Sequence, residues 1–151
     1  SDTFAEIELI QIDHLHACLQ DQSRYSTYDL NDALLTGNLA QAMKIFQYLM
    51  ASGEAMSLIL WSISKEMRLL MQLFEQPQNA LQLGIWKNKV SVYQQALRRL
   101  NPNSFLQWPA LLLRIDAAIK GMSKENPEHL VLQAITELCG KTLFLPNHPT
   151  Q

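Results

Sequence analysis

The sequence predicts an all-α fold, a compact bundle of six to seven helices. Apolar residues recur at intervals of three and four along most of the chain, which is the spacing of one face of a helix. Only five glycines and six prolines interrupt the 151 residues, which argues against turn-rich all-β architectures. A chain of this length forms one ordinary domain and buries roughly 70% of the surface that its unfolded form exposes.

The first 26 residues have the least regular pattern. Residues 4–12 alternate between apolar and polar, so we expect either an extended segment or the tail of an upstream element. Asp13 is a suitable cap for a short helix that carries Leu15, Cys18 and Leu19. A polar turn at residues 21–26 follows it.

Two helices are predicted next, separated by Gly37 and Asn38. The first covers about residues 27–36. Gly37 suits the left-handed residue that ends it, and Asn38 suits the cap of the second. The second helix carries apolar residues at helical spacing: Leu39, Ala42, Met43, Phe46, Leu49 and Met50.

The longest apolar pattern covers residues 54–76, and Pro77 ends it. Its polar residues form one narrow stripe, which predicts a central helix that is packed on nearly all sides. We therefore expect Trp61 and Met67 to lie in the core.

The remaining helices are predicted at about residues 85–100, 104–120 and 127–139, after a single turn at residues 78–84. Trp86 and Tyr93 fit the apolar stripe of the first, which favours core packing for both over stacking on a base. Pro109 falls near the first turn of the second, where a missing N–H donor costs little. Asp116 is expected to pair with Lys120, four residues further on.

The distribution of charge excludes one class of partner contact and leaves another open. The net charge of −2 excludes a polycation that grips nucleic acid with its whole surface. Charged residues make up 17% of the chain, against roughly 25% in a typical domain, which suits faces buried against partners. Residues 1–32 hold seven acids and one base, and residues 77–115 hold five bases and no acid. These segments either orient the domain against partners or are ordinary solvated faces.

No catalytic, cofactor or metal site is expected from the motifs. Gly140-Lys141-Thr142 lacks the preceding glycine, strand and helix of a phosphate loop. His14, His16 and Cys18 have no second cluster to complete a zinc site. With two distant cysteines, no secretory segment and no membrane-length apolar run, a cytoplasmic location is expected.

Several short runs along the chain together resemble the C-terminal part of the delta subunit of bacterial DNA polymerase III. The likeness covers about residues 11–144. The runs are DLNDALLTGN (29–38), AMKI (42–45) with Leu49, GE (53–54), LWSISKEMR (60–68), Trp86, YQQALRRL (93–100), IDAAIKG (115–121) and LCGK (138–141).

The resemblance implies a subunit of the clamp loader, the assembly that opens the sliding clamp and places it on primed DNA. Residues 13–145 would form the helical collar domain, preceded by a lead-in (1–12) from absent AAA+ modules and followed by a frayed tail (146–151). The domain would be non-catalytic and would bind the gamma/tau and delta-prime subunits, while the clamp would be bound only through the missing N-terminal module.

Two sets of candidate contact residues follow. The resemblance suggests that helix faces meet neighbouring subunits. The proposed interface residues are apolar residues that lie off the core stripes and are expected to be exposed (Ile45, Tyr48 and Leu132), together with the pair Arg98 and Arg99. The alternative is a helical interaction module that uses the basic face at residues 85–100. There, phosphates would meet Lys87, Lys89, Arg98 and Arg99 while an aromatic ring stacks on a base.

Overall fold

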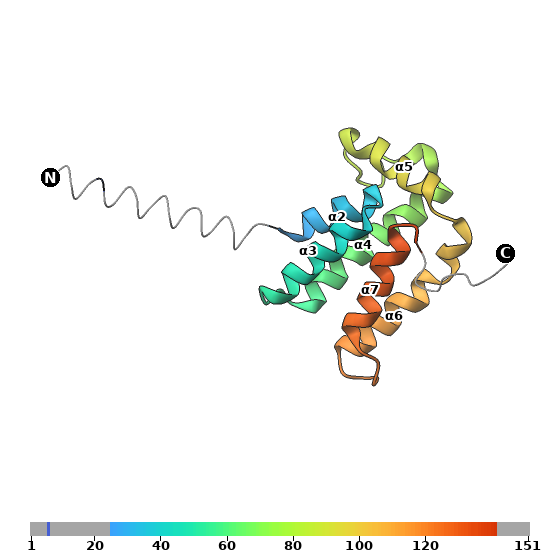
Figure 1. The fold of residues 1–151 in the computed structure, drawn as a ribbon. Coiled ribbons are helices and arrows are strands. Elements are labelled where there is room, and N and C mark those ends of the chain that lie inside the picture. The colour runs from blue at the N-terminus through green and yellow to red at the C-terminus, as the bar shows by residue number, and fades with distance from the viewer. Residues whose placement is uncertain (1–5, 7–24, 142–151) are drawn as a thin grey trace.

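The computed structural model describes Glu6 and residues 25–141, and it is all-α as predicted (Figure 1). It contains no strand in these residues. The α-helices are α2 (Thr27–Thr36), α3 (Leu39–Ala51), α4 (Met56–Glu75), α5 (Val90–Arg99), α6 (Trp108–Ile119) and α7 (Pro127–Leu138). Short 3₁₀ helices lie at η1 (Pro77–Asn79), η2 (Lys87–Lys89) and η3 (Pro102–Leu106).

The predictions for the two chain ends fall outside the described part of the chain. They are the extended segment at 4–12, the capped helix after Asp13, and the boundaries of the domain at residues 13 and 145. They stay predictions.

The predicted break between α2 and α3 is confirmed. Asp29 accepts a hydrogen bond from the backbone N–H of Ser26 at 2.7 Å, which closes the first turn of α2. Gly37 ends this helix in the left-handed conformation, with φ at 75°. The side chain of Asn38 then accepts the N–H of Gln41 at 3.1 Å and begins α3.

Helix α4 is the centre of the bundle and packs against α2, α5, α6 and α7. Its core face repeats at helical spacing and consists of Ile59, Ile63, Met67, Leu70 and Leu73, all fully buried. In Figure 1 the antiparallel pair α6 and α7 lies on one side of it, and α2 and α3 lie on another.

The prediction that α4 is covered on nearly all sides is wrong. Met67 is fully buried as expected, but Trp61 is 59% exposed and Leu58 and Phe74 are also exposed. The packed helices leave one side of α4 open. Sequence periodicity shows which residues of a helix face the core. It does not show how many neighbouring helices cover the other faces.

Two further boundaries differ from the prediction. Helix α5 begins at Val90 instead of residue 85, because Ile85 is buried before the helix and Trp86 then points outward, 76% exposed. The prediction that Trp86 packs in the core is therefore wrong, whereas Tyr93 is buried as expected. The predicted helix at 104–120 is split into η3 and α6, and α6 begins at Trp108 with Pro109 in its first turn.

An aromatic cluster joins α4, η3 and α6. The ring of Phe105 lies 5.3 Å from that of Phe74 and 4.7 Å from that of Trp108, measured between centroids. Trp108 is completely buried, and its indole N–H donates to Glu137 of α7 at 3.3 Å. One side chain thus links three elements of the core.

We predict that the two tryptophans of α4 and α6 differ sharply in their contribution to stability. Trp108→Ala should lower the free energy of unfolding by about 3–5 kcal/mol, because it opens a cavity in the core. Trp61→Ala should lower it by less than about 1 kcal/mol, because that ring is mostly solvated. Urea unfolding followed by circular dichroism measures both, and similar losses would contradict the packing described here.

Candidate functional site

Arg99 has a different role from the surface contact predicted for it. Its guanidinium donates to the carbonyls of Leu34 and Leu35 at the end of α2, at 3.2 and 3.3 Å. It also donates to the carbonyls of Leu138 and Cys139 at the end of α7, at 3.2 and 3.1 Å. Four of its five N–H donors are therefore used inside the domain.

The local environment of Arg99 suits this internal role. The last carbonyls of a helix lack partners within it and carry partial negative charge, which a cation at that end compensates. Burial lowers the pKa of Arg99 from its usual value, but an arginine stays charged in a protein. The thiol of Cys139 lies beside it, and burial raises the pKa of that thiol to about 11.

The other predicted interface residues fall in three different environments. Ile45 is 1% exposed and belongs to the core face of α3, so the expectation that it is an exposed apolar residue is wrong. Tyr48 and Leu132 are half-buried against the core. Arg98 is exposed on α5. Periodicity placed Ile45 off the stripe, but the fully buried stripe of α3 is Ala42, Ile45, Phe46 and Leu49, which is rotated toward Ile45.

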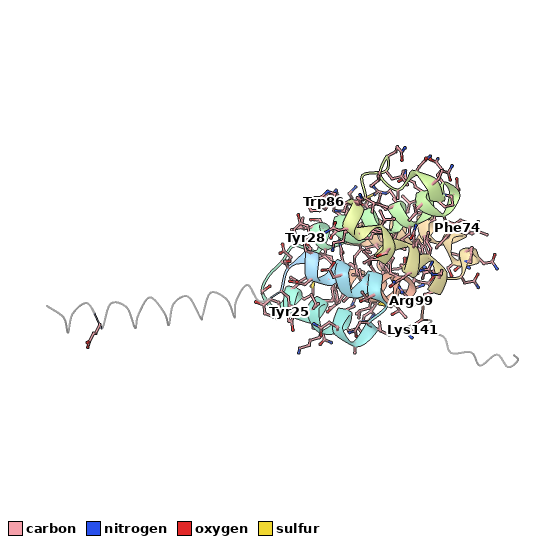
Figure 2. The ribbon with its side chains drawn as sticks, turned by 90° about the horizontal axis from the view of Figure 1, so that it is seen from above. Tyr25, Tyr28, Phe74, Trp86, Arg99 and Lys141 are labelled. Atoms are coloured by element: carbon pink, nitrogen blue, oxygen red, sulfur yellow. The ribbon has the colours of Figure 1, made fainter. Side chains whose placement is uncertain are left out.

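The predicted basic face is divided in the structure. Lys87 and Lys89 lie together in η2, directly after the exposed ring of Trp86. Lys89 contacts Asp32 of α2 with 3.1 Å between Nζ and Oδ1. Arg99 lies apart from Trp86, as Figure 2 shows, and faces the ends of α2 and α7.

An open groove lies between α4 and α6, and the sequence analysis did not identify it. Its volume is about 530 Å³. Helix α4 contributes Leu60, Ser64, Arg68 and Met71, and α6 contributes Pro109, Leu112, Leu113 and Asp116. The α4 residues recur at intervals of four and three, so a second stripe beside the core stripe was a signal that could have revealed it.

The groove combines apolar walls with one available cation. Leu113 at its edge is 71% exposed. Asp116 pairs with Lys120 at 3.0 Å, which confirms the predicted pair. Arg68 donates to Ser64 at 3.2 Å but makes no ion pair with any described carboxylate. Such a groove fits the apolar face of an amphipathic helix that carries an acidic residue.

The described residues hold no group of histidine, cysteine and acidic side chains that could ligate a metal ion. No helix in this part of the chain is long and apolar enough to cross a membrane. The described residues therefore form an all-helical domain with an open, mainly apolar groove.

The comparison with protein families then identifies the domain. Residues 25–137 match the family described as the DNA polymerase III delta subunit, C-terminal domain, and the chain belongs to this family. The chain is also 26% identical over 117 residues to DNA polymerase III subunit delta of Escherichia coli strain K12. This match covers 74% of the chain and 34% of that relative, so the chain spans about a third of its length.

We predict that the adjacent arginines of α5 are not equivalent. Arg99→Ala should lower the free energy of unfolding by about 2–4 kcal/mol, because carbonyls at two helix ends lose a charged donor. Arg98→Ala, the matched control, should change it by less than about 0.5 kcal/mol. Thermal and urea unfolding measure both variants. Equal stability of the two would show that the Arg99 contacts contribute little.

Proposed function

We propose that this chain is the oligomerisation domain of a clamp-loader delta subunit and that neighbouring subunits dock in the α4–α6 groove. The observation that carries the proposal is the groove itself, with apolar walls, an exposed Leu113 and the unpaired Arg68. Membership of the delta C-terminal family supports it, and so does the low fraction of charged residues. The proposed partners are the gamma/tau and delta-prime subunits.

The proposed role is assembly without catalysis. In a closed ring each domain meets two different neighbours and therefore uses two different faces. The groove would form one of them. Placement of the clamp on DNA would be carried out by the whole assembly, with this domain holding the subunits together.

The direct test is size-exclusion chromatography with light scattering. The chain is run alone and then mixed with the C-terminal domains of gamma/tau and delta-prime from the same source. We expect co-elution in a defined ratio. The experiment is repeated with full-length delta in place of the chain. If neither the chain nor full-length delta co-elutes with the partner domains, the proposal is contradicted.

Variants of the groove sharpen this test. Arg68→Glu and Leu113→Asp should each weaken the complex by at least about tenfold, because one reverses the charge and the other places a carboxylate on an apolar wall. Leu81→Asp is the matched control, since Leu81 is 60% exposed and lies outside the groove. If Leu81→Asp weakened the complex equally, the effect would not be specific to the groove, and this would contradict docking there.

A second candidate function is contact with nucleic acid through η2. It is favoured by one observation, the exposure of Trp86 directly before Lys87 and Lys89. An exposed aromatic ring beside lysines can stack on a base while the lysines meet phosphates. Arg98 is the other exposed base of the predicted face.

This second function predicts salt-dependent binding of a labelled single-stranded oligonucleotide, measured by fluorescence anisotropy. The affinity should fall steeply as the salt concentration rises. Lys87→Glu should weaken binding and should also reduce the slope of log affinity against log salt concentration by about one released ion. Lys44→Glu, on the exposed surface of α3, is the control. Undetectable or salt-independent binding would exclude this function.

A further inference from the structure

A second, smaller cavity of about 320 Å³ lies between α2, α4 and residues 84–93. Two aromatic rings stand at its mouth, those of Tyr28 and Trp86, which are 78% and 76% exposed. Figure 2 shows both on the same side of the molecule. Two large aromatic side chains that are this exposed at one opening have no role in the core.

The floor of this cavity is a buried polar cluster. The side-chain amide of Asn31 donates to Ser62 Oγ at 2.8 Å and to Glu66 Oε2 at 2.9 Å. The hydroxyl of Tyr93 donates to Glu66 Oε1. Asn31, Glu66 and Tyr93 all line the cavity and are at most 7% exposed.

The cluster leaves two electrostatic demands unmet within the described residues. The carbonyl oxygen of the Asn31 side chain is buried and accepts no hydrogen bond. The carboxylate of Glu66 receives bonds from two neutral donors and forms no ion pair. A buried acceptor without a donor and a buried anion without a counter-charge are both costly.

The two lysines at the edge of the cavity do not meet these demands. Lys89 is paired with Asp32 at 3.1 Å. Lys65 also lines the cavity, and its ammonium lies 5.6 Å from the centre of the Trp61 ring. The floor therefore offers acceptors and negative charge, while the walls at the mouth offer aromatic faces that attract a cation.

We propose that this cavity binds an alkylguanidinium or alkylammonium group. Its charge and its N–H donors would face Glu66 and the Asn31 side chain on the floor, while its stem would lie against Tyr28 and Trp86. The site is separate from the α4–α6 groove and goes beyond subunit association. A nucleobase also has donors and a flat face, but it brings no positive charge to Glu66.

The test is a titration of the isotopically labelled 151-residue chain, followed by ¹H–¹⁵N correlation spectra. The probes are n-butylguanidinium chloride and n-butylammonium chloride, with sodium chloride keeping the ionic strength constant. We expect saturable shifts of the Trp86 indole and the Asn31 side-chain amide signals. n-Butanol, which has the same stem and no charge, should produce none.

A further arm of the titration distinguishes the source of the cation. The peptide acetyl-Gly-Arg-Gly-amide presents the same group on a protein backbone. Tighter binding of the peptide than of butylguanidinium would indicate an arginine of a partner protein. Equal or weaker binding would indicate a free small cation. Both results support the site.

Variants separate the cavity from other surfaces. Because Asn31→Ala removes bonds to Ser62 and Glu66 and disturbs the fold, Trp86→Ala is the deciding variant, and it should weaken binding by about tenfold. Leu113→Ala, in the α4–α6 groove, should leave binding unchanged. The proposal is overturned if no cation gives saturable shifts, if butanol binds equally well, or if cytidine monophosphate binds in place of the cations.

Discussion

The guanidinium of Arg99 joins the ends of three helices, and the arrangement of the bundle depends on this contact. It bonds to carbonyls of α2 and α7 while belonging to α5. Within α5 only Tyr93 and Ala96 are buried, and its other apolar residues pack partly buried against the core. Near its start Tyr93 bonds to Glu66 of α4, and at its last residue Arg99 bonds to two other helices. Polar contacts at both ends thus add to the apolar packing that holds this helix.

Helix α4 serves three surfaces at once. One face carries the core stripe, a second forms the groove with α6, and a third supplies Ser62 and Glu66 to the polar cluster beneath the cavity. This explains why a helix so rich in apolar residues is not enclosed. Its apolar residues Leu60 and Met71 line the groove, where a partner helix would cover them. The core and the proposed interface are therefore neighbouring faces of one element.

The sequence predicted best what depends on local signals. The break at Gly37 and Asn38 and the pair formed by Asp116 and Lys120 require only residues that are close along the chain. The exposure of Trp86 was missed, because periodicity does not show that α5 begins only at Val90, four residues after Trp86. The role of Arg99 was missed because its acceptors are backbone carbonyls 39 to 65 residues away. Every residue has such a carbonyl, so the residue types do not indicate which ones Arg99 contacts. The groove and the cavity likewise depend on which helices meet.

The packing around Arg99 also sets which substitutions the turns of this domain tolerate. All five glycines have positive φ, a conformation that asparagine adopts more readily than other residues. A Cβ at Gly37 would lie 2.6 Å from Arg99 Nε, and one at Gly140 would lie 3.2 Å from the same side chain. The other three glycines have open space around them: Gly53, Gly84 and Gly121. A replacement at those three turns is therefore restricted by the backbone angle alone, whereas the two glycines beside Arg99 are restricted by shape as well.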